Sequence, residues 1–268
     1  SNIWLNEFMK TRNYLELSQY MIKLLKVAYK KCSKQKVDVK DKGLSDLVTS
    51  LDLSLEKFIT TALKKDFPET KIVSEEFNSK IEAKGTYFVL DPLDGTINFV
   101  NGLNSLYGLQ IAYIKNDVTV ASAIYFPSSD SSYTAAKNFG AFENGKKYVV
   151  AQKPVSHSLL NINTKRADFD TMYKLLEELK YKFLRFRIIG ADCYDFVASS
   201  LGNFGGLVMR NGNSWDILPG LFLAEQAECK ITTYKDYIIV TNTEEAQSAI
   251  LKAFRKIIKQ QKESKSAK

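Results

Sequence analysis

Two carboxylates, Asp91 and Asp94, follow the apolar run 87–90, which has the composition of a buried strand. Pro92 between them fixes its own φ and keeps Asp91 extended, so the two carboxylates are held on a stiff bend. Gly95 then allows a sharp turn and lets a bulky anion come close to the backbone. Because carboxylates repel an anion unless a divalent cation lies between them, this stretch favours a metal-assisted phosphate site.

Thr96 can open a helix after this bend, and the free N–H groups of a helix start favour an anion such as phosphate. The string Asp-Pro-Leu-Asp-Gly is also good turn chemistry, and taken alone it fits a plain turn equally well. Three other stretches bear on this choice. They are residues 46–52 upstream, residues 72–76, which end in two glutamates, and the distant pair Trp215 and Asp216.

Together and in this order, the four stretches resemble the signature of the inositol monophosphatase family of Mg²⁺-dependent, lithium-sensitive phosphatases. The resemblance spans the chain from Asp46 to Asp216. It implies a mixed α/β fold, a layered αβαβα sandwich with the active site between its two halves. It also implies hydrolysis of a small phosphate monoester, and a homodimer.

The same resemblance implies two Mg²⁺ ions, and it allows a weaker third ion at Glu75. The first ion takes Glu75, Asp91 and the Leu93 carbonyl, and the second takes Asp91, Asp94 and Asp216. These are oxygen donors, which Mg²⁺ prefers. Two such ions about 4 Å apart can neutralise the phosphate charge, activate a water molecule and assist the leaving oxygen.

The family pattern assigns the catalytic water to Glu75 and Thr96, with Asp52 accepting a hydrogen bond from the Thr96 hydroxyl. From the residues alone, Asp52 fits equally well as the N-cap of the helix that follows it. The Gly95 and Thr96 amides are expected to bind the phosphate oxygens. The substrate-binding residues implied by the match are Asp94, Gly95, Thr96 and Asp216.

Substrate identity is less constrained by the motifs. Inositol-specific members carry an acid seven positions before the Trp-Asp aspartate, where this chain has Met209 followed by Arg210. An arginine can grip a second phosphate through paired N–H donors, so Arg210 is predicted to bind substrate unless it faces solvent or a dimer contact. This favours a 3′(2′),5′-bisphosphate nucleotidase or a fructose-1,6-bisphosphatase as the alternative activity. Asn98 favours inositol or fructose substrates, and Asp192 either contacts substrate or caps a helix.

The net charge of +8 invites a nucleic-acid partner, but most of it lies at one end of the chain. Residues 252–268 hold seven Lys or Arg and one Glu, without base-reading motifs, so nucleic-acid binding is disfavoured. A non-catalytic partner of the transcription machinery is the alternative from another functional class. The carboxylate set argues against it, because a binding module has no use for so many like charges in one place.

Composition predicts a cytoplasmic protein without membrane spans. No apolar run reaches about 18 residues, and no secretory signal precedes the first predicted helix. Cys32, Cys193 and Cys229 are odd in number and scattered, which fits reduced thiols. His157, the only histidine, excludes a His-rich zinc site and is expected in a surface loop.

Periodicity predicts an N-terminal half, residues 1–153, that carries most metal ligands, and a C-terminal half, residues 154–268, that adds the substrate pocket and Asp216. Helices are expected at about 3–32, 52–65, 168–180, 191–202, 216–227 and 243–260. Strands are expected at 71–74 and 86–91, in an antiparallel meander over 106–150, and at 159–163, 183–188, 206–209 and 230–240. Residues 33–43 read as a polar loop.

Overall fold

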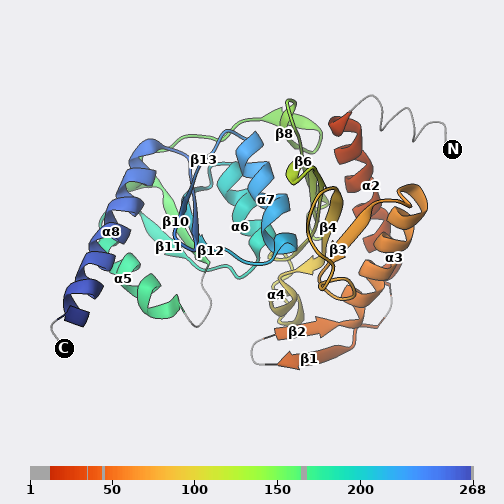
Figure 1. Cartoon of the computed structure of the whole chain (residues 1–268), viewed down its shortest axis with the longest axis horizontal. Helices are drawn as coiled ribbons and strands as arrows, with labels where there is room; N and C mark the ends of the chain where they lie inside the picture. The colour runs from red at the N-terminus through yellow and green to blue at the C-terminus, as the bar shows by residue number, and fades with distance from the viewer. Residues whose placement is uncertain (1–12, 35, 44–45, 164–167, 267–268) are drawn as a thin grey trace.

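A computed structural model of the chain describes residues 13–34, 36–43, 46–163 and 168–266. Helices and strands alternate in five layers, α, β, α, β and α, from one end of the molecule to the other (Figure 1). This confirms the expected layered α/β sandwich. In these described ranges, none of the helices is long and apolar enough to cross a membrane.

The elements agree closely with the periodicity of the sequence. The helices are α2 (Tyr14–Cys32), α3 (Ser50–Asp66), α4 (Thr96–Val100), α5 (Phe169–Leu179), α6 (Asp192–Ser200), α7 (Ser214–Gln226) and α8 (Glu244–Ser266). The strands are β1 (Val39–Gly43), β2 (Asp46–Thr49), β3 (Lys71–Ser74), β4 (Tyr87–Asp94), β5 (Gly108–Lys115), β6 (Val118–Phe126), β7 (Ser131–Ala136), β8 (Gly140–Glu143), β9 (Lys146–Tyr148), β10 (Leu159–Asn163), β11 (Arg185–Arg187), β12 (Phe204–Arg210), β13 (Lys230–Tyr234) and β14 (Tyr237–Thr241).

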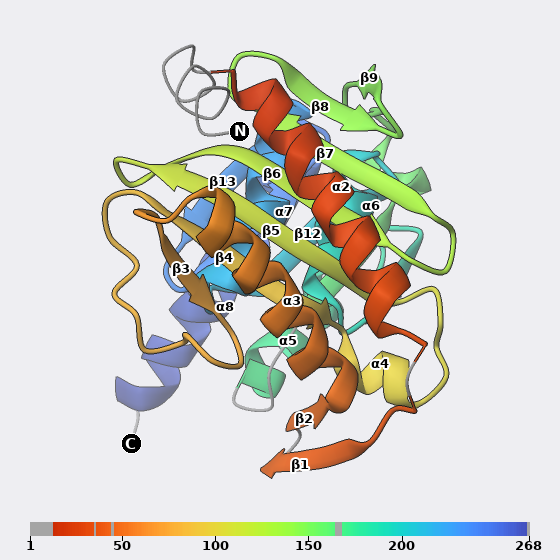
Figure 2. The ribbon, with the colours of Figure 1, turned by 90° about the vertical axis from the view of Figure 1, so that its right-hand side faces the viewer.

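A seven-stranded sheet in the order β3-β4-β5-β6-β7-β8-β9 forms the first β layer. Only the β3–β4 pair is parallel, and β5 to β9 run as the predicted meander. Helices α2 and α3 lie across one face of this sheet (Figure 2). Helix α2 presents Leu17, Met21, Leu25 and Ala28 to the core at the spacing of one helix face.

The central layer consists of α6 and α7, which pack against both sheets. Phe222 and Leu223 of α7 join a cluster with Ile124 and Phe126 of the large sheet. Other side chains of the same two helices, such as Phe196 of α6, pack on the second sheet. Since both sides of this layer are covered, the two helices are rich in buried apolar residues.

The second sheet has the order β11-β10-β12-β14-β13, and α5 and α8 cover its outer face. Strands β10, β11 and β12 are parallel, while β14 runs antiparallel to both of its neighbours. All strands of the large sheet precede residue 153 and all strands of this sheet follow residue 154. The division of the chain into two halves at that point stays a prediction.

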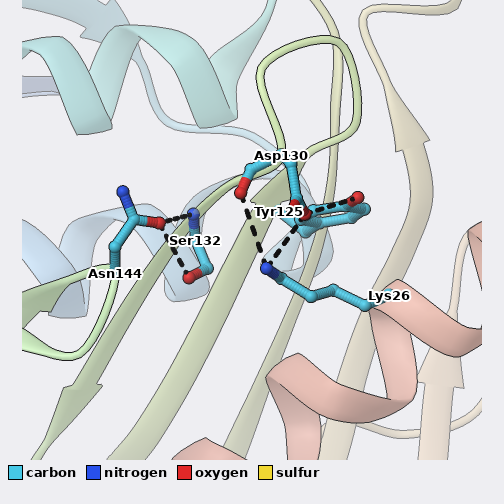
Figure 3. Close-up of polar contacts among 5 residues, drawn as sticks. All are labelled: Lys26, Tyr125, Asp130, Ser132 and Asn144. Carbon is cyan, nitrogen blue, oxygen red and sulfur yellow. Dashed lines mark hydrogen bonds and ion pairs between the residues drawn. The ribbon is translucent and has the colours of Figure 1, made fainter.

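Polar contacts fasten α2 to the far strands of the large sheet (Figure 3). Lys26 Nζ lies 3.0 Å from Asp130 Oδ1, which also accepts a hydrogen bond from the Tyr125 hydroxyl at 3.1 Å. Close by, the Asn144 side-chain oxygen accepts hydrogen bonds from the amide and the hydroxyl of Ser132. The Lys26–Asp130 ion pair and the Ser132–Asn144 hydrogen bonds are exposed, so they orient the elements more than they stabilise them.

Three expectations need correction or completion. The polar segment expected to be a loop contains β1, which pairs with β2 because the alternating Lys and Asp side chains of 39–43 tolerate an edge strand. The predicted helix at 3–32 is described from Tyr14, and its earlier part lies outside the described residues. His157 is exposed, as expected, but in a short 3-10 turn, Val155–His157.

Candidate active site

The two central carboxylates lie at an irregular end of β4. Asp91 pairs with Gln110 and Asp94 with Gly108 of β5, and the register shifts between these two pairs. Pro92 lies within the shift, where its missing N–H costs no ladder hydrogen bond. Asp91 is buried, whereas Asp94 is partly exposed. The irregular pairing thus presents both carboxylates at the end of one strand.

Gly95 then turns the chain into α4. Its φ is +86°, in the left-handed region that favours glycine, and a Cβ there would lie 2.7 Å from the Leu106 carbonyl oxygen. The turn leaves Thr96 as the first residue of a helix of five residues. The sequence of this bend therefore fixes where the chain leaves the sheet.

A cleft of about 200 Å³ opens at this point, and it contains every residue predicted to bind metal. None of the described residues that line it is Lys or Arg. The cleft is lined by Leu47, Glu75, Asp91, Leu93, Asp94, Gly95, Thr96, Ile97, Gly190, Asp192 and Asp216. Five carboxylates thus meet in one small depression.

Asp216 reaches the cleft because of how α7 docks. Trp215 packs against a cluster that includes Val73 and Val89 of the large sheet, which places the first turn of α7 beside the end of β4. The buried Gln110 amide donates a hydrogen bond of 3.2 Å to the Asp216 carbonyl. Sequence reasoning missed Gln110, although a polar residue in an apolar strand was an available signal.

Burial and like charge both act on the central carboxylates. Burial, together with the negative charges of Glu75, Asp94 and Asp216, raises the pKa of Asp91 well above its ordinary value. Loss of solvent raises the pKa of Asp94 to about 6, although N–H groups of Cys193 and Asp192 hydrogen-bond to its carboxylate. The carboxylates are therefore close enough to repel one another, and the folded protein holds them against that repulsion.

The donor set fits a divalent cation by its chemistry. Carboxylate and carbonyl oxygens are the ligands that Mg²⁺ prefers, and a cation between the carboxylates would offset the repulsion that raises their pKa values. In the described ranges, no group of three or more His, Cys, Asp or Glu side chains is close enough in its present conformation to hold a metal ion. The structure brings Glu75, Asp91, Leu93, Asp94 and Asp216 to one cleft, and their assignment as ligands stays a prediction.

Asp52 and Thr96 contact each other across the site. The Thr96 hydroxyl lies 3.0 Å from Asp52 Oδ1 and 2.8 Å from the Leu93 carbonyl oxygen, and it has one proton for these two acceptors. Asp52 is not the N-cap of α3: Thr49 is, and the Asp52 carboxylate accepts a hydrogen bond from the Thr49 amide at 2.9 Å. Burial raises the pKa of Asp52, while the hydrogen bonds from Thr49 and Thr96 lower it.

If Thr96 passes a proton as the family pattern implies, Thr96→Val should lower kcat by about a hundredfold, with a smaller change in KM, because valine keeps the shape but has no hydroxyl. Steady-state kinetics with saturating Mg²⁺ measures this change. The matched control is Thr61→Val on α3, an exposed threonine whose hydroxyl bonds only within its own helix. A Thr96→Val enzyme with wild-type kcat would exclude the hydroxyl from the reaction.

Arg210 is the one predicted substrate-binding residue that the structure does not bring to the cleft. Its guanidinium lies 2.5 Å from Asp168 Oδ1, at the N-terminal end of α5, and 3.7 Å from Asp236 Oδ2. Asp168 is buried and also accepts a hydrogen bond from the Tyr237 hydroxyl. This ion pair holds the guanidinium beside Asp168, away from the residues that line the cleft, and a contact of Arg210 with substrate stays a prediction.

Arg210→Ala should therefore destabilise the protein by about 1–3 kcal/mol, because it removes a charged partner from the buried Asp168 carboxylate. The ratio of kcat/KM for bisphosphate and monophosphate substrates should stay at its wild-type value. Thermal unfolding and kinetics measure the two effects, with the exposed Arg185→Ala as control. A selective loss of bisphosphate hydrolysis in Arg210→Ala would show instead that Arg210 binds a second phosphate.

Asp192 is one of the residues that line the cleft. It is the first residue of α6, whose N-cap is Ala191, so it does not cap that helix. Its carboxylate accepts a hydrogen bond of 2.5 Å from the Asn163 amide, which also donates to the buried Asp195. This amide bridge from β10 was not visible in the sequence, because its partners lie 29 and 32 residues away.

A comparison with known families decides the identity of the fold. The inositol monophosphatase family model matches residues 9–265, nearly the whole chain. The chain belongs to this family. Helices, strands and cleft thus agree with the resemblance that the four sequence stretches indicated.

Curated relatives in this family carry different names. The fructose-1,6-bisphosphatase/inositol-1-monophosphatase of Thermotoga maritima is 28% identical over 195 residues, 73% of this chain and 74% of the relative. The putative Nus factor SuhB of Neisseria meningitidis is 30% identical over 196 residues, 71% of this chain and 75% of the relative. Family membership alone therefore leaves the substrate open.

Solved structures share the fold. The IMPase of Thermotoga maritima superposes with a TM-score of 0.79 at 24% identity, over 90% of this chain and 98% of that chain. An IMPase/NADP phosphatase complexed with Mg²⁺ and phosphate has a TM-score of 0.73 at 23% identity, over 93% of this chain and 95% of that chain. At these identities the likeness speaks for the architecture only.

Proposed function

We propose that the chain is a Mg²⁺-dependent phosphatase that hydrolyses small phosphate monoesters. The observation that carries this proposal is the cleft itself, where five carboxylates meet and no described lining residue is basic. An anionic substrate cannot approach such a cleft without a cation. Membership in the inositol monophosphatase family supports the proposal, as does the solved relative that is complexed with Mg²⁺ and phosphate.

In this proposal Glu75, Asp91, Asp94, Asp216 and the Leu93 carbonyl hold two Mg²⁺ ions. Bound there, Mg²⁺ neutralises phosphate charge and lowers the pKa of water. A third ion at Glu75 stays a prediction from the family pattern.

In this proposal the Thr96 hydroxyl takes part in proton transfer. If the Leu93 carbonyl faces a cation, Asp52 is the remaining acceptor for the Thr96 hydroxyl proton. The Thr96 oxygen then keeps its lone pairs free to accept a proton from an attacking water, with Asp52 behind it. Asp94 and Asp216 line the cleft and would contact the alcohol part of a substrate, and the Gly95 and Thr96 amides would bind phosphate oxygens.

The proposed substrate is a small phosphorylated metabolite, in keeping with the names of the curated relatives. A phosphate-release screen tests the proposal with inositol 1-phosphate, fructose 1,6-bisphosphate and 3′-phosphoadenosine 5′-phosphate, each with Mg²⁺ and with chelator. We expect Mg²⁺-dependent release from at least one monoester. Release that chelator leaves unchanged, or no release from a wide set of monoesters, would overturn it.

The relatives named Nus factor give the second candidate, a regulatory partner of the transcription machinery. The two functions differ in what the carboxylates do, because binding to another protein or RNA does not require them. A pull-down of transcription components by wild type and by Asp91→Asn separates the candidates. Retained capture with lost hydrolysis would show that one chain does both. A homodimer, expected from the family, is tested by light scattering.

A further inference from the structure

A fully buried carboxylate, Glu56, stands outside the predicted ligand set. It lies on α3, one helix turn after Asp52, and its side chain has no exposed surface. Residues four apart share one face of a helix, so α3 turns both carboxylates toward the same end of the large sheet. In the sequence the apolar face of this helix was the evident feature, and its polar face was overlooked.

Glu56 accepts three hydrogen bonds from the last residue of β3 and from the turn that follows it. The Ser74 hydroxyl and the Phe77 amide donate to Oε1 at 2.5 and 2.8 Å, and the Glu76 amide donates to Oε2 at 2.8 Å. The Ser74 oxygen also accepts a hydrogen bond from the Asn78 amide. An ionised carboxylate inside a protein is costly unless such donors surround it, so these bonds specify one geometry for the turn.

This turn carries Glu75. The amide of Glu75 itself donates to the Leu90 carbonyl of β4 at 3.3 Å. The amides of the next two residues, Glu76 and Phe77, donate to the Glu56 carboxylate. The backbone of Glu75 is therefore fixed on both sides. Its side chain lines the cleft beside Asp91, whose pKa it raises.

We propose that Glu56 is a positioning residue that sets where the Glu75 carboxylate stands in the cleft. Without it, two backbone N–H groups lose their acceptor and the turn can take other conformations. The inference rests on the proposed function, in which the Glu75 carboxylate binds a divalent cation. It predicts that a residue without access to the cleft controls the affinity of the site for a divalent cation.

The test compares Glu56→Gln with Ile59→Val, a fully buried apolar variant of the same helix. Glutamine keeps the size of the side chain but turns an N–H₂ group toward a donor, whereas Ile59→Val costs about 1 kcal/mol of packing only. Binding of Mn²⁺ alone is measured by titration calorimetry, without substrate, at a temperature where all variants are folded. Phosphate release is measured in parallel.

We expect Glu56→Gln to weaken Mn²⁺ binding by about 10-fold and to lower kcat at saturating metal. This is the lower end of the range for residues that bond a metal ligand directly, because Glu56 bonds the neighbours of Glu75 and not its carboxylate. Ile59→Val should bind Mn²⁺ as wild type does. If Glu56→Gln does not fold, Ser74→Ala serves instead, with a several-fold loss expected. Wild-type affinity in these variants overturns the inference, whereas a wild type that binds no Mn²⁺ overturns the proposed function.

Discussion

Asp91→Asn should reduce kcat by at least about a thousandfold, which corresponds to about 4 kcal/mol of transition-state stabilisation. In the proposed site Asp91 would be a ligand of both cations, so its loss would remove a ligand from each. The fold should stay intact or gain stability, because burial and three neighbouring carboxylates already raise the pKa of this group. Asparagine keeps the shape and removes the buried charge.

Two measurements on Asp91→Asn check this expectation, kcat at saturating Mg²⁺ and the unfolding temperature without metal. The control is Asp130→Asn, which removes an exposed carboxylate that does not line the cleft and should change neither by much. Near-wild-type turnover in Asp91→Asn would show that the bridge is misplaced. A large loss of stability would show that the carboxylate is structural.

Metal-free protein should lose stability as pH rises from about 4 to about 6 and beyond, by a few kcal/mol. The sign follows from the pKa values, since Asp94 titrates at about 6 and Asp91 well above its ordinary value in the folded protein. In this pH window the folded state binds more protons than the unfolded state. The protonated forms of Asp91 and Asp94 therefore contribute fully to the free energy of unfolding at low pH. This contribution disappears as the carboxylates ionise.

Mg²⁺ should reverse this loss near neutral pH. A cation at a hundred times its dissociation constant adds about 2.7 kcal/mol, and it acts only where the carboxylates are ionised. Thermal unfolding over pH, with chelator and with Mg²⁺, measures both effects. Asp94→Asn should flatten the pH dependence of the metal-free protein. A metal-free protein that becomes more stable between about pH 4 and 6 would contradict the assigned charge repulsion.

Local chemistry explains why the central bend was predictable. Pro92 and Gly95 restrict the backbone by themselves, so their positions indicated where β4 ends and where the chain turns. The start of α7 was predicted at Asp216, whereas the helix begins two residues earlier, at Ser214, after the N-cap Asn213. The prediction that these stretches meet at one site, however, came from the family resemblance. Spacing along the chain does not tell which segments become neighbours in the fold.

Side-chain pairing between distant segments was the part that sequence could not supply. Arg210 was predicted to face substrate, but its partner Asp168 lies 42 residues earlier in the chain and on another layer. Glu56 and Gln110 were missed for the same reason, since their acceptors and donors become neighbours only after the sheet and its helices assemble. Gln110 is polar within an apolar strand, which is the signal that remained unused.

Crystals soaked with Mn²⁺ test the central claim most directly, because the anomalous signal of manganese locates the cation without reference to activity. We expect peaks in the cleft, within coordination distance of the Asp91 carboxylate and shared among Glu75, Asp94, Asp216 and the Leu93 carbonyl. Peaks only elsewhere on the protein, or a cleft without any peak at saturating Mn²⁺, would contradict this expectation.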